Sequence, residues 1–353
     1  MAIINPKLGK KLKDYGAVNF NACYNCGTCT AVCTLSTKED SFPREMVRYS
    51  VAGMNEDIKS SLKPWLCYYC GECTTNCPQT ANPGELMMAL RRYLMAQYDW
   101  TGLSGLLFKS LPFSVIAFLL VVAGVVAYTF SVGFNLETMM HTGHYFEMFA
   151  IGGVLIAILL PNIIRMWWFT IVKPKRNAPV SSYIRNIGEF FTTMFTQKRA
   201  LECEDNKMRW VEHLILVIGY LALLFTTVFL DWFSTHNLFV ITFGYAVSAV
   251  VFAVTLIFVS DRIKKKKELS KFSHHSDWYF VIGLFLMGFT AFLVRLFIDL
   301  GLLQTNIWMY ILHLIILASW ALIIVPFGKW THFLYRSFAV YFDKIAHCQK
   351  TGL

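Results

Sequence analysis

The chain has 353 residues, of which 56% are hydrophobic and only 15% are charged, and its formal net charge is +10. An average soluble protein is about half apolar and about a quarter charged, so this composition excludes a single ordinary soluble domain. The Lys and Arg residues stand between hydrophobic blocks rather than along one stripe, which argues against nucleic acid as a partner.

The apolar residues are concentrated after Leu106, which predicts two domains, residues 1–105 and residues 106–353. The opening segment, MAIINPKLGKKLKDYG, has basic residues but lacks the apolar region of a signal peptide. We therefore expect the first domain to stay in the cytoplasm. Thiols remain reduced there, and clustered cysteines act as metal ligands more often than as disulfides.

Residues 1–105 contain two copies of the spacing C-x2-C-x2-C-x3-C. The copies are Cys23, Cys26, Cys29, Cys33 and Cys67, Cys70, Cys73, Cys77. In two-cluster ferredoxins, three close thiolates of such a run bind one [4Fe–4S] cluster and the fourth crosses to the other cluster. The spacing therefore predicts a first cluster on Cys23, Cys26, Cys29 and Cys77, and a second on Cys67, Cys70, Cys73 and Cys33.

Two details bear on this prediction. Pro78 follows Cys77 as in the ferredoxin pattern, whereas Thr34 follows Cys33. Structural zinc is the alternative, although zinc sites usually use pairs of C-x2-C. Cys203 and Cys348 stand alone and are interpreted as ordinary thiols. Residues 44–65 and 82–96 have helical rather than strand patterns, so we expect an α-helical ferredoxin domain.

Six later stretches are long and apolar enough to cross a membrane, which takes about 20 residues. They are residues 111–132, 144–172, 210–233, 238–260, 278–302 and 307–333. The loops 173–209 and 261–271 are rich in Lys and Arg, whereas the loops 131–144, 231–237 and 299–306 contain none. The positive-inside rule then predicts a multi-pass protein of the cytoplasmic membrane, with both termini and the ferredoxin domain in the cytoplasm.

Histidines inside the predicted spans are candidate haem ligands, because ionisable groups at that depth are costly and usually functional. In the predicted topology His213 and His332 both lie near the inner face, which predicts an inner b-type haem between them. The alternative is a pair of interfacial histidines that bond to lipid or backbone. Arg209, Lys329 and Arg336 are expected to neutralise the propionates of this haem.

His313 lies nearer the outer face and predicts a second, outer haem. We favour His144 as its other ligand, with His141 and His236 as further candidates. The alternative is a protein with a single haem. Arg295 precedes Asp299 by one helical turn. It is interpreted either as half of a structural ion pair or as a group that holds a haem propionate or a quinone oxygen.

The two cysteine motifs in a helical domain resemble the C subunit of heterodisulfide reductase. The six spans are similar to the E subunit of that enzyme and to the cytochrome b subunit of nitrate reductase. Their fusion, over nearly the whole chain, resembles the C-subunit family of the quinone-interacting membrane-bound oxidoreductase (Qmo) complexes. The nitrate reductase pattern maps onto His213, His313 and His332. Its fourth ligand falls in the third span, where this sequence has GYLALLF and no histidine.

The resemblance implies a subunit that passes electrons between menaquinone and two flavin- and iron–sulfur-containing partner subunits. Adenylylsulfate (APS) reductase is then the cytoplasmic end of the electron-transfer chain, in dissimilatory sulfur metabolism. The residues predict single-electron carriers and no general acid or nucleophile. One alternative is a heterodisulfide-reductase-type or sulfite-pathway membrane subunit with the same cofactors. Another is a transporter or channel with an iron–sulfur sensor domain, for which inverted repeats would be expected.

Overall fold

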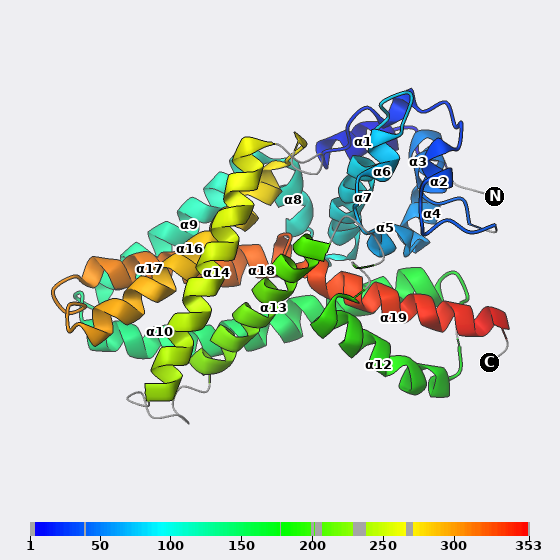
Figure 1. The fold of residues 1–353 in the computed structure, drawn as a ribbon. Helices are drawn as coiled ribbons and strands as arrows, with labels where there is room; N and C mark the ends of the chain where they lie inside the picture. The colour runs from blue at the N-terminus through cyan, green and yellow to red at the C-terminus, as the bar shows by residue number, and fades with distance from the viewer. Residues whose placement is uncertain are drawn as a thin grey trace.

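The computed structural model describes residues 4–38, 40–176, 178–198, 201, 207–228, 238–265 and 271–351. Throughout these ranges the regular structure is helical, apart from one antiparallel bridge between Ile4 and Met54. The predicted all-α fold class is therefore confirmed. Figure 1 shows a group of short N-terminal helices at one end of an elongated bundle of long helices.

The N-terminal domain is built around one long helix, α7, whose residues are nearly all buried. The elements are α1 (Leu8–Asp14), η1 (Phe20–Ala22), α2 (Thr28–Ala31), α3 (Arg44–Ala52), α4 (Asn55–Ser60), α5 (Lys63–Leu66), α6 (Glu72–Thr75) and α7 (Pro83–Tyr98). α7 begins at a proline, whose fixed φ suits the first helical position and whose missing N–H is not needed there. Leu86 and Leu90 of α7 pack with Leu12 and Met46 in the domain core.

The remaining helices are longer and more apolar. They are α8 (Leu103–Lys109), α9 (Leu111–Ser131), α10 (Leu136–Gly153), η2 (Val154–Leu159), α11 (Leu160–Trp167), η3 (Trp168–Val172), α12 (Val180–Thr196), α13 (Lys207–Val228), α14 (Leu238–Lys264), α16 (His275–Asp299), α17 (Ile307–Ser319), η7 (Trp320–Ile324), α18 (Val325–Phe327) and α19 (Thr331–Thr351). α8 crosses the predicted boundary at residue 105 and packs on both α7 and α9.

Five helices are long and apolar enough to cross a membrane, and they coincide with five of the six predicted spans. They are Leu111–Ser131, Leu136–Val172, Leu238–Lys264, His275–Asp299 and Ile307–Cys348. The predicted third span, 210–233, lies on α13 and continues into residues outside the described ranges, so the count of six stays a prediction.

Two of these helices differ from their predicted bounds by more than four residues. The second begins at Leu136 rather than His144, because Asn135 caps it by accepting a hydrogen bond from the Thr138 N–H. Hydropathy alone could not place that polar first turn. The last helical run continues well past residue 333 and is interrupted at Gly328, which has an extended backbone. A Cβ at Gly328 would lie 2.6 Å from the Ile324 carbonyl oxygen.

One hydrophobic core joins the N-terminal domain to the membrane-type helices. Trp65 of α5 and Tyr98 of α7 pack against Tyr335 of α19, with ring centroids 5.3 Å and 5.6 Å away. Ile163 and Phe342 belong to the same cluster. The two parts therefore meet through buried aromatic side chains, and α19 lies beside the N-terminal helices in Figure 1.

Candidate iron–sulfur and haem sites

The two cysteine motifs fold in the same way. Gly27 and Gly71 have φ of 90° and 95°, and each immediately precedes a four-residue helix, α2 or α6. Only glycine enters this left-handed region without steric cost, so the repeated C-G-x-C sequence requires it. Asn25 and Tyr69 also have positive φ, of 60° and 57°. The repeat in the sequence is therefore a repeat in the backbone.

This backbone directs amide groups at the cysteine sulfurs. The Asn25 N–H donates to Cys23 Sγ over 3.3 Å, and the Tyr69 N–H donates to Cys67 Sγ over the same distance. The Ala81 N–H donates to Cys77 Sγ at 3.4 Å. Hydrogen bonds of this kind stabilise thiolates and tune the potential of iron–sulfur clusters. The local geometry is thus suited to sulfur ligands.

The first predicted set converges on one pocket. Its lining includes Cys23, Cys26, Cys29 and Cys77. Cys77 comes from the second motif, and the packing of α2 on α6 brings it to the first. The structure therefore places together the four cysteines that the crossed pairing groups.

The second predicted set is also brought together. Cys67 and Cys70 lie close enough to Cys33 for their charges to act on its thiol. The same three cysteines act on the thiol of Cys73. Among the described residues, no His, Cys, Asp or Glu group is arranged to hold a single metal ion. Cysteines spread around a pocket instead fit a larger, multi-atom cluster. The ligand assignments themselves stay predictions.

The two sets differ in exposure. The first set has one exposed cysteine, Cys26, and one buried cysteine, Cys29, whereas the second set has two buried cysteines, Cys67 and Cys73, and none exposed. Burial raises the pKa of the Cys33 thiol to about 11, and it raises the pKa of the Cys73 thiol further. The second set therefore lies deeper in the protein than the first.

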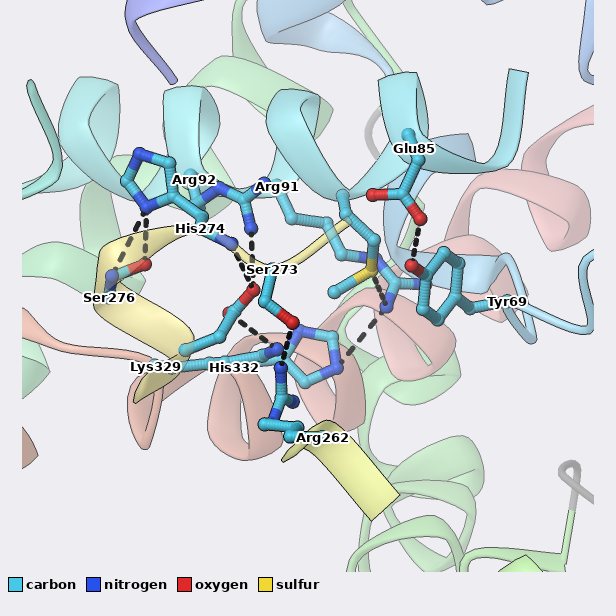
Figure 2. Close-up of polar contacts among 12 residues, drawn as sticks. Tyr69, Glu85, Arg91, Arg92, Arg262, Ser273, His274, Ser276, Lys329 and His332 are labelled. Atoms are coloured by element: carbon cyan, nitrogen blue, oxygen red, sulfur yellow. Dashed lines mark hydrogen bonds and ion pairs between the residues drawn. The ribbon is translucent and has the colours of Figure 1, made fainter. Parts of the chain in front are cut away.

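A buried arginine connects the second set to the last membrane-type helix. Arg91 of α7 donates from Nε to the Pro64 carbonyl at 2.7 Å and from Nη2 to the Cys67 carbonyl. Its Nη1 lies 3.3 Å from Nε2 of His332 in α19 (Figure 2). The Trp65 ring also lies 5.7 Å from the His332 ring. Burial lowers the pKa of Arg91 to about 10, so it stays charged at neutral pH.

A second polar cluster lies beside this arginine. Asp277 accepts from Lys329 at 2.7 Å and from Arg92 at 3.4 Å, and both Asp277 and Arg92 are buried. Tyr69 donates to the buried Glu85, which Figure 2 shows at the start of the same helix as Arg91 and Arg92. Desolvation by burial raises the pKa of Glu85 to about 7.

Apart from Lys329, sequence reasoning missed these groups. A signal was available, because Glu85, Arg91 and Arg92 are charged residues inside the otherwise apolar run PGELMMALRRYLMA. Asp277 similarly stands at the start of the predicted fifth span. Buried charges are found only where they are paired. Charged residues at such positions therefore indicate partners, but not which ones.

The predicted inner haem ligands are neighbours in the structure. His213 lies close enough to His332 for its charge to act on the His332 ring. The charge of Arg336 acts on both histidines. The His213 side chain is exposed. A guanidinium can only donate, so Nε2 of His332 accepts from Arg91 here. An iron ligated by that nitrogen would replace this contact.

His313 is held in the tautomer that a metal ligand requires. Thr290 Oγ1 donates to the Leu286 carbonyl at 2.8 Å and lies 2.9 Å from His313 Nδ1. Because the hydroxyl hydrogen is already used, the Thr290 oxygen accepts from Nδ1–H, which leaves the Nε2 lone pair of His313 free. The residues around His313 therefore fit a histidine that would hold a haem through Nε2.

The proposed partner of His313 is less well placed. The ring of His144 lies 6.1 Å from that of Tyr145 on its own helix, and His141 also contacts Tyr145. α10 meets α17 at Gly143, where a Cβ would lie 2.5 Å from the Tyr310 hydroxyl oxygen. His236 and Cys203 lie outside the described residues. A pairing of His144 with His313 stays a prediction.

Three of the predicted cofactor-binding cations have protein partners. Arg295 forms a bidentate pair with Asp299, at 3.1 Å and 2.7 Å. Arg209 donates to the Tyr69 carbonyl at 3.1 Å, and Lys329 pairs with Asp277 as described above. The structure thus gives these side chains a part in holding the protein together.

Comparison with known proteins supports the iron–sulfur interpretation. Residues 22–82 match the 4Fe-4S dicluster domain family. Over 96 residues the chain is 26% identical to a heterodisulfide reductase C-subunit-like protein of Archaeoglobus profundus, and the match covers 27% of this chain and 51% of that protein. The chain thus spans about half the length of this curated relative, and no solved structure matches significantly. The chain is an all-α protein with a 4Fe-4S dicluster-type domain and a likeness to the C subunits of heterodisulfide reductases.

Proposed function

We propose that this chain is the membrane electron-transfer subunit of a quinone-linked oxidoreductase complex. It passes single electrons between menaquinone and cytoplasmic flavin- and iron–sulfur-containing partner subunits, with APS reductase as the terminus. Its carriers are b-type haem and two [4Fe–4S] clusters, which supply one-electron chemistry when bound. The observation that carries the proposal is the buried packing of Trp65, which lies two residues before Cys67, against Tyr335 of the last membrane-type helix, because it places the second cysteine site next to that helix.

The chain's own residues have defined parts in this proposal. The eight motif cysteines would hold the two clusters, His213 and His332 would hold the inner haem, and His313 and His144 would hold the outer haem. Thr290 fixes the ring orientation of His313. Trp65 and Tyr98 pack on Tyr335 of the last membrane-type helix and would hold the cluster loop at a fixed distance from it.

A heterodisulfide-reductase-type subunit is the second candidate. The similarity to the heterodisulfide reductase C-subunit-like protein favours it. It would use the same cofactors with a different cytoplasmic partner. Copurification distinguishes the two, because the first predicts APS reductase among the proteins bound to the full chain and the second does not.

Visible and EPR spectra of the full chain purified in detergent test the proposal. We expect that menadiol reduces b-type haem bands and that dithionite produces the EPR signals of reduced [4Fe–4S] clusters. Variant His313→Ala should lose part of the haem absorption and keep the cluster signals. Material with neither iron–sulfide nor haem, or with haem that menadiol does not reduce, would refute the proposal.

A further inference from the structure

The helix α12 exposes a stripe of large apolar side chains. Five of them follow one another at intervals of three or four residues, so they share one face of the helix. They are between 42% and 74% exposed, and they are Val180, Ile184, Ile187, Phe191 and Phe195. Single exposed apolar residues are normal on a protein surface, but a contiguous run of them marks an interaction surface.

The other two faces of α12 differ from this stripe. One face packs on α19, where the ring centroids of Phe190 and Phe338 lie 4.5 Å apart. On the same face the Tyr341 hydroxyl donates to the Tyr183 carbonyl at 2.9 Å. The remaining face is polar and carries the exposed Arg185. Outside its contact with α19, the helix is therefore amphipathic.

Two tryptophans fix the level of α12 relative to the predicted spans. Near its start, Trp167 Nε1 donates to the Tyr183 hydroxyl at 3.2 Å. At its end, Trp210 Nε1 donates to the Thr196 carbonyl at 2.8 Å. Trp167 lies close to the end of the helical run Leu136–Val172, and Trp210 lies close to the start of α13.

Both tryptophans therefore stand at predicted inner ends of spans, and tryptophan is enriched at that depth, where the membrane meets water. The two residues that they bond, Tyr183 and Thr196, are separated by about 20 Å of helix axis. A helix held at this depth near both of its ends lies along the membrane surface rather than pointing away from it.

The stripe is also on a part of the protein that the N-terminal domain leaves open. α19 packs on α12 and also on α5 and α7, and it lies between α12 and the N-terminal helices in Figure 1. An apolar face beside a polar one, at the level of interfacial tryptophans, is the pattern of a helix that lies in the plane of the membrane. We propose that the stripe of α12 is seated in the inner leaflet of the membrane, with lipid acyl chains as its occupant.

This inference goes beyond the proposed function, because it requires only that the predicted spans cross a membrane and not that the chain carries electrons. It gives α12 the part of an anchor. α12 would hold α19, which carries His332 and Tyr335, against the membrane surface.

Photo-crosslinking of the full chain tests the inference. The replacement of Phe191 by the photoreactive p-benzoylphenylalanine keeps an aromatic side chain in the stripe, and the same replacement of Ile184 provides a second position in case the first variant does not fold. The protein is reconstituted into vesicles of phosphatidylcholine and phosphatidylglycerol and irradiated. Mass spectrometry of the α12 peptide then measures its adducts with lipid and with protein. Irradiation of membranes from the producing cells repeats the measurement in the presence of protein partners.

The matched control is the same replacement of Arg185, which is exposed on the polar face of the same helix. We expect severalfold more lipid adduct in the Phe191 and Ile184 variants than in the Arg185 variant. Equal lipid adducts in the three variants, or adducts of the stripe mainly with another protein or a second copy of the chain, would overturn the inference. Strong lipid adducts in material with neither clusters nor haem would support it and contradict the proposed function. Redox-active material without lipid adducts at the stripe would do the reverse.

Discussion

Nη1 of Arg91 lies 3.3 Å from Nε2 of His332, although the two residues are 241 positions apart in the chain. The same guanidinium holds the carbonyls of Pro64 and Cys67. One buried side chain therefore fixes the loop of the second cysteine site to the last membrane-type helix. Its planar fork holds three separate acceptors in fixed directions, whereas the three donors of an ammonium group all lie on one nitrogen.

We predict that Arg91→Lys destabilises the protein although it keeps the charge. Hydrogen bonds to a charged group contribute roughly 1.5–3 kcal/mol each, and the variant leaves at least one buried carbonyl without a donor. Thermal unfolding in detergent should show a clear loss of stability, and the EPR signal of the second cluster should broaden or weaken. Arg48→Lys, at an exposed position in α3, is the control and should match wild type. Equal behaviour of the two variants would contradict this role for Arg91.

The buried carboxylate of Asp277 should matter more than a surface carboxylate with similar partners. Asp277 pairs with Arg92 and Lys329, and its side chain is 6% exposed. Asp277→Asn leaves two cations without their counter-charge, and breaking such a buried pair costs about 3–5 kcal/mol.

The control for Asp277 is Glu56→Gln. Glu56 also contacts two cations, Lys59 and Lys173, but its side chain is 38% exposed. Surface ion pairs contribute about 1 kcal/mol or less. Chemical unfolding of both variants compares the two losses. A loss for Asp277→Asn no larger than that for Glu56→Gln would disprove the assignment of a buried interdomain ion pair.

Glu85 should make the stability fall as pH rises between about 4.5 and 7. Desolvation raises its pKa in the folded protein from an ordinary value of 4.5 to about 7. Between these pH values the folded protein keeps the proton that the unfolded chain has lost, so the free energy of unfolding decreases with pH, by at most about 3 kcal/mol.

Glu85→Gln removes this titration. The difference in unfolding temperature between wild type and variant should therefore grow in favour of the variant from pH 5 to pH 7.5. A difference that is constant over this range would show that Glu85 is ionised in the folded protein throughout. Tyr69→Phe, which removes the hydroxyl that donates to Glu85, should raise the Glu85 pKa and shift the transition to higher pH.

The crossed cysteine pairing predicts which variants resemble each other. Cys77→Ser should damage the same cluster as Cys26→Ser, although Cys77 is in the second motif, because both line one pocket. Cys33→Ser should instead match Cys70→Ser. Iron content and EPR of the reduced full chain distinguish the two clusters. If Cys77→Ser behaved like Cys70→Ser, each motif would hold its own cluster and the crossed assignment would be wrong.

The sequence allowed the helical fold to be predicted, because helices depend on local periodicity. The crossed grouping of the cysteines, which the ferredoxin spacing predicts, stays a prediction. The five membrane-type helices follow from hydropathy alone. The contact between the N-terminal domain and the last membrane-type helix could not be predicted. Arg91 meets His332 only after α7 and α19 pack, and no local pattern encodes that contact. The start of the second span at Leu136 was missed for a related reason, since a capping asparagine rather than apolarity sets it. Gly328 likewise interrupts the last helix at a point that hydropathy does not mark.

Thr290 provides a test of the haem site that does not depend on turnover. Its side chain is 1% exposed, and its oxygen accepts from Nδ1–H of His313 while its hydroxyl donates to the Leu286 carbonyl. Thr290→Val keeps the shape but removes the acceptor, so the imidazole loses the bond that fixes its tautomer. Loss of such an outer partner typically lowers affinity for the metal group about 10–100-fold. We expect lower haem content and a shifted midpoint potential in the valine variant. Thr290→Ser retains the hydroxyl and should restore both. If valine and serine variants both match wild type in haem content and potential, His313 is not a ligand held by Thr290.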